Sequence, residues 1–462
     1  MLAVGSLTAC GDGSVPAEVE VGTAGTLGVG DPYFSSAGNG GYDVQAYDLR
    51  ASVTIDGPDR IDAVVTITAI ATRPLASFSL DLVGLELGDV TVDGGPAVVE
   101  RDGAEVVVST PRPIPSGETF TVVVPYSGEP AGDGDAVQTL EDGGGWLDLG
   151  AYSAVLAEPV GAARWIPCND HPSDKALFSA TITVPAPLEA VANGLLVERS
   201  DTGASSTFRW VAEEPMAPYL MTLAIGDYEL IERPPIGDAV VMDAYPPDRV
   251  DLGRTAFGAF PDMVQFFSDR FGTYPFSAAG NIIVPGMPPT ALETQTRSLF
   301  SETLLADGGT PELVAHELAH QWFGDAVTPA TWRDIWLNEG PAVYSQWLWT
   351  EHIGGPSVIE SAAAAYDPED PDLDVPPADP GVAELFGTSV YVRSAIFLVE
   401  LHQRMGDQRF TTLLRTWVDR HRFGSATTAE FEALANEVNG EPLDDLMQPW
   451  LYGDELPGLT FG

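Results

Sequence analysis

The sequence predicts an α+β protein with two structured domains, a β-rich domain over residues 46–231 and a mostly helical domain over residues 232–462. Three observations support this fold class. A chain of 462 residues exceeds one ordinary domain and suits two. Short β-branched segments separated by Gly, Asp and Pro fill the first half, which is typical of antiparallel strands. Apolar residues at helical spacing recur through the second half.

Composition limits the classes of partner. Hydrophobic residues make up 44% of the chain and charged residues 19%, which is ample for buried cores. The chain has 68 acidic residues against 21 basic ones and a formal net charge of -47. The negative electrostatic potential of such a chain repels nucleic acid and anionic lipid surfaces, so neither is an expected partner. Two cysteines are too few for a stabilising disulfide framework.

Residues 1–45 are predicted to be a truncated lipoprotein-type signal and a flexible tether. Leu7-Thr8-Ala9-Cys10 resembles a bacterial lipoprotein signal, in which the cysteine is lipidated and becomes the new amino terminus. The positive n-region of an export signal is missing, so we interpret the start as truncated. We therefore expect a bacterial, extracytoplasmic protein, secreted or tethered to a membrane through Cys10, with Cys168 left as a free, buried thiol.

The β-rich domain is expected to be mostly antiparallel, because its apolar segments are short, β-branched and bounded by turn residues. The clearest predicted strands are 63–69, 105–110, 119–124 and 177–184.

From about residue 232 the apolar spacing becomes helical, with one short strand expected at 281–284 beside the first helix. The predicted helices are 257–271, 311–323, 341–352, 391–405 and 428–437.

A metal-binding pattern lies on the second of these helices. His316-Glu317-Leu318-Ala319-His320 is the HExxH pattern of zinc peptidases, and residues four apart share one face of a helix, so both imidazoles can bind one ion. Thr310-Pro311 supports a helix that begins just before, with a capping hydroxyl and proline in the first turn. The competing interpretation is that His316 and His320 are buried histidines with a structural role only. That interpretation does not explain why the acidic residue Glu317 lies beside the core.

Glu339 is the predicted third ligand. A metzincin would have glycine at 323 and histidine at 326, where this chain has Phe323 and Ala326. Glu339 follows His320 by nineteen positions, and a second helix packed on the first can bring its carboxylate to the ion. A catalytic zinc site takes three protein ligands and leaves the fourth position to water. We therefore predict one Zn²⁺ per chain.

Glu317 is the predicted general base. One position along a helix turns its side chain about 100° away from that of His316, so Glu317 is unsuited to share the metal with both histidines. It can instead reach a zinc-bound water, take its proton and later deliver a proton to the leaving amine.

The residues around this motif resemble a known family. His316-Glu-Leu-Ala-His-Gln-Trp-Phe-Gly-Asp325, followed by Trp332-Arg-Asp-Ile-Trp-Leu-Asn-Glu-Gly340, is similar to the gluzincin aminopeptidases of the aminopeptidase N group. The resemblance implies a saddle-like β-domain followed by a thermolysin-like catalytic domain. It extends from about residue 40 to the end and corresponds to a short form without the C-terminal helical domain of longer members.

The resemblance implies a substrate-binding segment upstream of the metal helix. The family's Gly-x-Met-Glu-Asn matches Thr290-Ala291-Leu292-Glu293-Thr294, with Thr290 in place of glycine and Thr294 in place of asparagine. On this basis Glu293 binds the α-ammonium group of the substrate, and the backbone at Ala291 and Leu292 contacts the substrate. A solvated loop acid is the competing interpretation of Glu293.

Two further positions follow from the resemblance. Glu158, which stands before the Arg164-Trp-Ile-Pro-Cys168 segment, matches a residue that enters the same amine pocket. Tyr391 heads Tyr391-Val-Arg-Ser-Ala395 and matches the family's transition-state tyrosine, with Arg393 and Ser394 in place of lysine and glycine. A phenol there can donate to the developing oxyanion. The alternatives are a β-turn acid for Glu158 and a packing tyrosine for Tyr391.

Together these features predict a zinc metallo-aminopeptidase that releases amino-terminal residues from peptides with a free amino end. A thermolysin-type endopeptidase would share the metal chemistry, but it would not need Glu158 and Glu293 where an amine lies. A catalytically inactive binding homologue would not need the intact ligands and base. Hydrolysis of a lipid epoxide, known in one branch of the family, would require a cavity that the sequence does not reveal.

Overall fold

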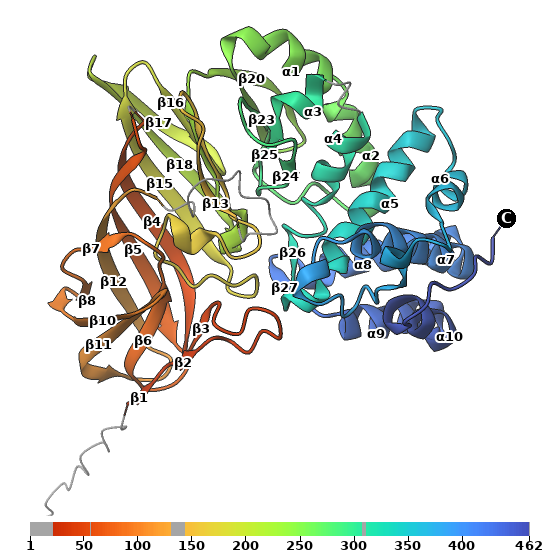
Figure 1. Cartoon of the computed structure of the whole chain (residues 1–462), viewed down its shortest axis with the longest axis horizontal. Helices are drawn as coiled ribbons and strands as arrows, with labels where there is room; N and C mark the ends of the chain where they lie inside the picture. The colour runs from red at the N-terminus through yellow and green to blue at the C-terminus, as the bar shows by residue number, and fades with distance from the viewer. Residues whose placement is uncertain (1–21, 56, 131–143, 307–310, 462) are drawn as a thin grey trace, which may run out of the picture.

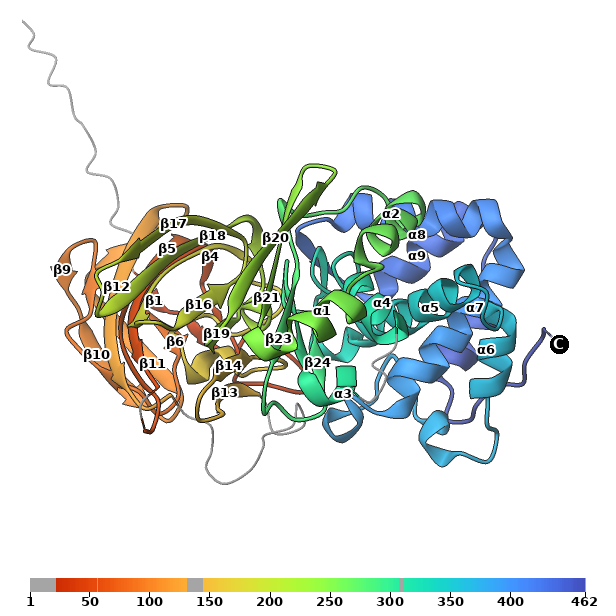
Figure 2. The same cartoon turned by 90° about the horizontal axis from the view of Figure 1, so that it is seen from above.

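The protein is described here from a computed structural model that covers residues 22–461 except 56, 131–143 and 307–310. Two bodies lie side by side, a β-domain at the amino-terminal end and a mixed, mainly helical domain at the carboxyl-terminal end (Figures 1 and 2). Cys10 and Thr310 lie outside the described residues. Within the described ranges, no helix combines the length and apolar character needed to cross a membrane.

A long curved sheet forms the body of the β-domain (Figure 2). Its strands are β4 (Tyr42–Thr54), β5 (Arg60–Ala71), β7 (Glu86–Leu87), β8 (Thr91–Val92), β9 (Gly95–Pro96), β12 (Thr119–Gly128), β15 (Ala176–Pro185), β17 (Leu195–Asp201) and β18 (Ser205–Met216). They run in the order β17-β18-β15-β4-β5-β12-β8-β9, with β7 also beside β12, and β15 runs parallel to β4 whereas the other neighbours are antiparallel. Buried residues alternate along β5 and β15, which follows from one face packing on a core.

Smaller sheets complete the β-domain. One runs β1-β6-β11-β10 and another β13-β14-β19-β16, and β2 pairs with β3. Their strands are β1 (Thr23–Ala24), β2 (Thr26–Leu27), β3 (Asn39–Gly40), β6 (Leu75–Asp81), β10 (Val98–Asp102), β11 (Glu105–Ile114), β13 (Gly145–Asp148), β14 (Ser153–Leu156), β16 (Glu189–Ala192) and β19 (Leu223–Gly226). The predicted strands at 63–69, 105–110, 119–124 and 177–184 are therefore all confirmed.

Residues 22–45, which composition assigns to a flexible tether, are packed on both domains. They contain β1, β2 and β3 and the start of β4. Asp31 is buried; its carboxylate accepts hydrogen bonds from the backbone N–H groups of Phe34 (2.9 Å) and Trp332 (2.8 Å), and it pairs with His171 at 3.2 Å. The many Gly, Ser and Asp residues here form turns on a folded surface, a role that composition does not distinguish from a linker.

The catalytic domain begins with a sheet in the order β20-β21-β23-β25-β24, with β22 beside β21. Its strands are β20 (Glu229–Ile236), β21 (Ala239–Tyr245), β22 (Ala278–Ala279), β23 (Asn281–Val284), β24 (Ala291–Leu292) and β25 (Ser298–Ser301), while β26 (Val327–Pro329) and β27 (Gly424–Ala426) pair separately. The predicted strand at 281–284 is confirmed, and β24 lies at an edge of the sheet.

Helices pack behind this sheet toward the carboxyl terminus (Figure 1). The α-helices are α1 (Val250–Ala256), α2 (Phe260–Phe271), α3 (Glu302–Ala306), α4 (Pro311–Ala319), α5 (Trp336–His352), α6 (Val358–Ala365), α7 (Ser394–Met405), α8 (Asp407–His421), α9 (Thr428–Asn439) and α10 (Asp444–Met447). Short 3₁₀ turns are η2 (Ala162–Arg164), η3 (Pro218–Leu220), η4 (Pro247–Arg249), η5 (Trp332–Asp334), η6 (Pro371–Asp374) and η7 (Val382–Glu384), and π-helical turns are η8 (Ser389–Arg393) and η9 (Gln448–Tyr452).

One predicted boundary differs in a way that matters for function. The apolar spacing predicts a helix over residues 341–352. The helix α5 begins at Trp336 instead and carries Pro341 inside it. Glu339 therefore lies in the first turn of a helix, on a rigid element that packs against α4.

Candidate active site

Two histidines and one glutamate converge between α4 and α5. His316 lies in the last turn of α4, His320 in the turn that follows, and Glu339 in the first turn of α5. The two histidine Nε2 atoms are 3.1 Å apart, and they lie 3.3 and 3.4 Å from Glu339 Oε2. All three side chains are buried or nearly so.

These separations fit a metal site. Ligand atoms at about 2.0–2.1 Å from a tetrahedral zinc are roughly 3.3–3.4 Å from one another. His320 Nδ1 lies 3.0 Å from the backbone carbonyl oxygen of Phe323, a contact that places the proton on Nδ1 and leaves Nε2 free to ligate. Burial disfavours the ionised carboxyl of Glu339, but His320 and His316 outweigh burial and lower its pKa to about 2. An ionised carboxylate and a free imidazole nitrogen are the forms that zinc binds.

Glu317 is buried one residue after His316 and is not part of the converging ligand set. Its carboxyl interacts with His320, Glu293 and Glu339 across the site. Burial, together with the charges of Glu293 and Glu339, raises its pKa well above the usual range, although His320 opposes this. A carboxyl with a raised pKa next to the site is suited to accept a proton and return it.

Two more buried carboxylates stand beside the ligand set. Single carboxylate oxygens of Glu158, Glu293 and Glu339 all lie within 4.8 Å of one another. Oε1 of Glu158 and Oε1 of Glu293 are buried, and no described residue donates a hydrogen bond to either atom. Burial and the charges of Glu293 and Glu339 raise the pKa of Glu158. Because buried acids without donors are unstable as anions, this cluster calls for cationic partners beyond the histidines.

The strand that leads into Glu293 is paired on one side. Strand β24 pairs antiparallel with β25, so Ala291 faces Phe300 and Leu292 faces Leu299. The outer edge of β24 has no strand neighbour among the described residues, which leaves its backbone free to pair with an extended chain.

The two departures from the family pattern have structural partners. The Thr290 backbone N–H donates to Pro288 O at 2.6 Å, and its carbonyl accepts from Ser301 N at 3.0 Å. The Thr294 hydroxyl donates to Arg297 O, which closes the turn after Glu293. The Thr294 side chain therefore stabilises this turn, whereas the two Thr290 bonds belong to the backbone.

Tyr391 reaches the ligand set from a different helix. It lies in the π-helical turn η8 before α7, and its ring stacks on His316 with centroids 6.1 Å apart and planes 17° apart. Gly340 allows this approach, because a Cβ at Gly340 would lie 2.6 Å from Ser394 Cβ. A π-turn often marks a functional position in a helix.

Arg393 fixes the turn that carries Tyr391. Its guanidinium is fully buried and donates only to backbone carbonyls. The accepting residues are Leu373, Asp374, Val375, Pro449, Trp450 and Gly453. The arginine thus ties two distant loops to the base of η8.

Sequence reasoning missed several residues next to the site. Tyr219 donates to Gly324 O at 2.9 Å, and Asn338 donates to the Tyr219 oxygen at 3.3 Å. Lys175 donates to the carbonyl oxygens of Asp325 (2.7 Å) and Ala326 (3.1 Å). These bonds join the β-domain to the turn that follows α4. The one sequence signal for Lys175 is that it is the only lysine in the chain.

Comparison with known proteins is consistent with this arrangement. The peptidase family M1 domain matches residues 255–450, and the peptidase M1 N-terminal domain matches residues 44–220. Similar curated proteins include "Probable aminopeptidase 2" of Sulfurisphaera tokodaii, 27% identical over 65% of this chain and 41% of that protein. "Aminopeptidase M1-B" of Oryza sativa subsp. japonica is 27% identical over 65% of this chain and 37% of that protein. The chain thus spans less than half the length of these curated relatives.

Solved structures resemble the whole chain more fully. An M1 zinc metallopeptidase from Deinococcus radiodurans superimposes with a TM-score of 0.86 and 32% identity, covering 94% of this chain and 98% of that one. A mutant of an M1 zinc metallopeptidase from the same organism, bound to a Tyr-Ser-Ala substrate, gives a TM-score of 0.86 and 31% identity, covering 94% and 99%.

Proposed function

Because this chain belongs to peptidase family M1, we propose that it is a zinc-dependent aminopeptidase that releases single residues from the amino ends of peptides. The observation that carries the proposal is the group of buried carboxylates beside the three metal ligands. An enzyme that cuts internal bonds has no cation to place between Glu158 and Glu293, whereas a free peptide amino end supplies one.

His316, His320 and Glu339 would hold the zinc. When bound, zinc acts as a Lewis acid that polarises a peptide carbonyl and acidifies water in its coordination shell. Their mutual distances of 3.1–3.4 Å and the burial of the Glu339 carboxylate support this assignment.

Glu293 and Glu158 would bind the α-ammonium group. Hydrogen bonds between ionised groups are roughly twice as strong as neutral ones, and these carboxylates are almost fully removed from water. The ammonium group would supply the donors that Oε1 of both residues lacks. Binding there fixes the first peptide bond beside the metal ligands, so position and specificity depend on the same two acids.

Glu317 would act as the general base. It takes a proton from the attacking water as the water's oxygen bonds to the carbonyl carbon, and it passes that proton to the nitrogen of the leaving amine as the C–N bond breaks. The Tyr391 hydroxyl would donate a hydrogen bond to the carbonyl oxygen as negative charge develops there. The ring of Tyr391 is stacked on that of His316, which places the tyrosine beside the three residues that would bind the metal.

A matched pair of substrates tests the proposal. Acetylation of the amino end removes the positive charge and keeps the scissile bond, so kcat/KM should fall to background for the acetylated member. Comparable cleavage of both members would refute the amine assignment and leave the metal assignment standing.

We also propose that the protein is extracytoplasmic and anchored by lipid on Cys10. The support is the Leu7-Thr8-Ala9-Cys10 pattern and the fact that Cys168 is buried and free. In a bacterial host the protein, given a complete export signal ahead of Leu7-Thr8-Ala9-Cys10, should partition with membranes, and Cys10→Ala should move it to the soluble fraction. A soluble parent protein with an unmodified Cys10 would contradict the anchor.

A further inference from the structure

One buried side chain links the metal helix to the segment that carries Glu293. Gln321 directly follows His320, and its side chain is 2% exposed. Its Nε2 donates to Glu293 O at 3.0 Å, and its Oε1 accepts from Thr296 N at 2.8 Å. A single amide group therefore binds both ends of the turn Glu293–Thr296.

The turn needs such support because its backbone is strained. Thr296 has φ +73°, in the left-handed region that β-branched residues rarely adopt. Its backbone N–H is bound by Gln321, and its hydroxyl accepts from Gly194 N at 2.9 Å. Asn193 Nδ2 donates to Gln295 O at 2.8 Å from the same β-domain turn. The turn is thus held by residues of both domains. Gln321, in the turn that follows α4, connects it to the segment that carries His316 and His320.

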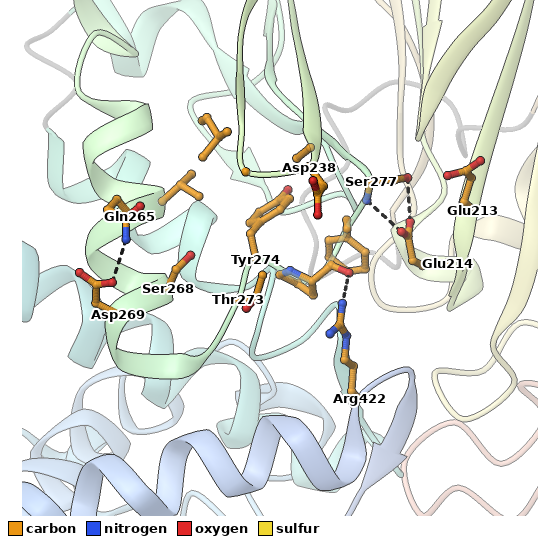
Figure 3. Close-up of a pocket in the computed structure, with 16 residues that line it drawn as sticks. Glu213, Glu214, Asp238, Gln265, Ser268, Asp269, Thr273, Tyr274, Ser277 and Arg422 are labelled. Atoms are coloured by element: carbon orange, nitrogen blue, oxygen red, sulfur yellow. Dashed lines mark hydrogen bonds between the residues drawn. The ribbon is translucent and has the colours of Figure 1, made fainter.

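Two residues that contact Gln321 and the turn also border a cavity. Tyr274 and Glu214 line a hollow of about 630 Å³, and both are labelled in Figure 3. The Tyr274 hydroxyl approaches Gln321 Oε1 at 3.4 Å, and Gln295 Nε2 approaches Glu214 O at 3.4 Å. Both of these contacts are long for hydrogen bonds, so the shorter bonds from the Gln321 amide to Glu293 O and Thr296 N hold the turn more firmly.

We propose that Gln321 is a positioning residue that sets the spacing between the metal ligands and the carboxylate of Glu293. This inference rests on the proposed function. An aminopeptidase cuts one residue from the amine, so the separation between amine site and metal decides which bond is cut. Gln321 directly follows His320 in the chain, and its side chain is hydrogen-bonded to the backbone of Glu293, so it connects the two sites directly.

The test measures how much more tightly the protein binds a peptide with a free amino end than a peptide whose amino end is acetylated. It uses protein that also carries Glu317→Gln, which should not hydrolyse the peptides. Calorimetry with zinc-loaded protein gives the ratio of Kd for an acetylated tripeptide to Kd for the free tripeptide. Gln321→Met keeps the size of the side chain and removes both polar contacts. We expect the ratio to fall by roughly 10-fold to 100-fold, since small misplacements have effects of this order, with zinc content unchanged.

Two further variants keep the inference falsifiable. Gln321→Glu preserves an acceptor for Thr296 N but places a carboxylate oxygen against Glu293 O, so the Kd ratio should also fall. This variant takes the place of Gln321→Met if Gln321→Met does not fold. Gln265→Met on α2 is the matched control, since Gln265 is exposed and bonds only Asp269 within its helix (2.8 Å), and it should keep the parental ratio.

The outcomes separate the inference from the proposed function. If Gln321 only supported packing, its substitution would lower Tm and weaken the binding of both peptides equally. An unchanged Kd ratio in both Gln321 variants would overturn the positioning role. A parent protein that binds both peptides equally would overturn the proposed function, and the inference with it.

Discussion

Replacing Glu293 by glutamine should make the metal-free protein more stable and the enzyme much less active. The carboxylates of Glu158, Glu293 and Glu339 lie within 4.8 Å of one another and are buried. Two unit charges about 4.8 Å apart repel by roughly 3.5 kcal/mol at an effective dielectric constant of about 20. Burial is the larger cause that disfavours the charged form of Glu293, and His320 opposes both effects, so removal of this charge should stabilise the metal-free protein by about 1 kcal/mol or more.

The loss of activity follows from the missing charge-assisted contact. Hydrogen bonds to charged groups contribute about 1.5–3 kcal/mol, which corresponds to roughly a 10-fold to 150-fold fall in kcat/KM for a free-amine substrate. Glutamine keeps the shape of the side chain, so zinc content should not change.

Thermal unfolding in excess chelator and steady-state kinetics of the zinc enzyme measure both effects. Glu400→Gln is the matched control, because Glu400 is equally buried but accepts from the backbone N–H and hydroxyl of Thr460. The control should lose stability, since glutamine replaces two charge-assisted hydrogen bonds with weaker neutral ones. A Glu293→Gln protein that is less stable than the parent and retains kcat/KM would refute the reasoning.

Three further predictions concern other parts of the molecule. Glu339→Ala should deplete zinc, as measured by metal analysis, whereas Glu317→Gln should retain zinc and lose activity; near-normal turnover of Glu317→Gln would exclude it as the base. Tyr391→Phe should lower kcat roughly 10²-fold with little change in KM or Tm, and an unchanged kcat would assign the tyrosine to packing. Burial lowers the pKa of Lys175 to about 7, so the unfolded chain binds more protons than the folded one above that pH. The lysine should therefore make the free energy of unfolding rise with pH between about 7 and 10, with a contribution of up to about 1.4 kcal/mol per pH unit, and Lys175→Met should remove that contribution in denaturant titrations.

The metal ligands were predictable because their information is local. His316 and His320 are four apart on a helix, and a Glu on a nearby second helix completes a known ligand set. The antiparallel strands were predictable for the same reason, since alternation and turn residues are short-range signals. The helix α8 is absent from the predicted helices although its buried residues follow helical spacing, and α6 is absent although Ser357 and Glu360 form a capping box.

The supporting residues were not predictable because their partners are distant in the chain. Asp31 bonds Trp332, 301 positions away, and Gly194 bonds Thr296, 102 positions away. Nothing in the local sequence distinguishes Asp31 from a linker acid. Gln321 likewise gains its role only when the turn after Glu293 is folded against the metal helix.

The most direct test of the central claim is the order in which products appear. Mass spectrometry over time, with an unmodified peptide of about ten residues, reports each fragment without a reporter group that could bias cleavage. If Glu158 and Glu293 hold the amino end beside the metal, the peptide should shorten one residue at a time from that end, and free amino acids should accumulate. Internal fragments that appear before the singly shortened peptide would contradict the account and identify the protein as an endopeptidase.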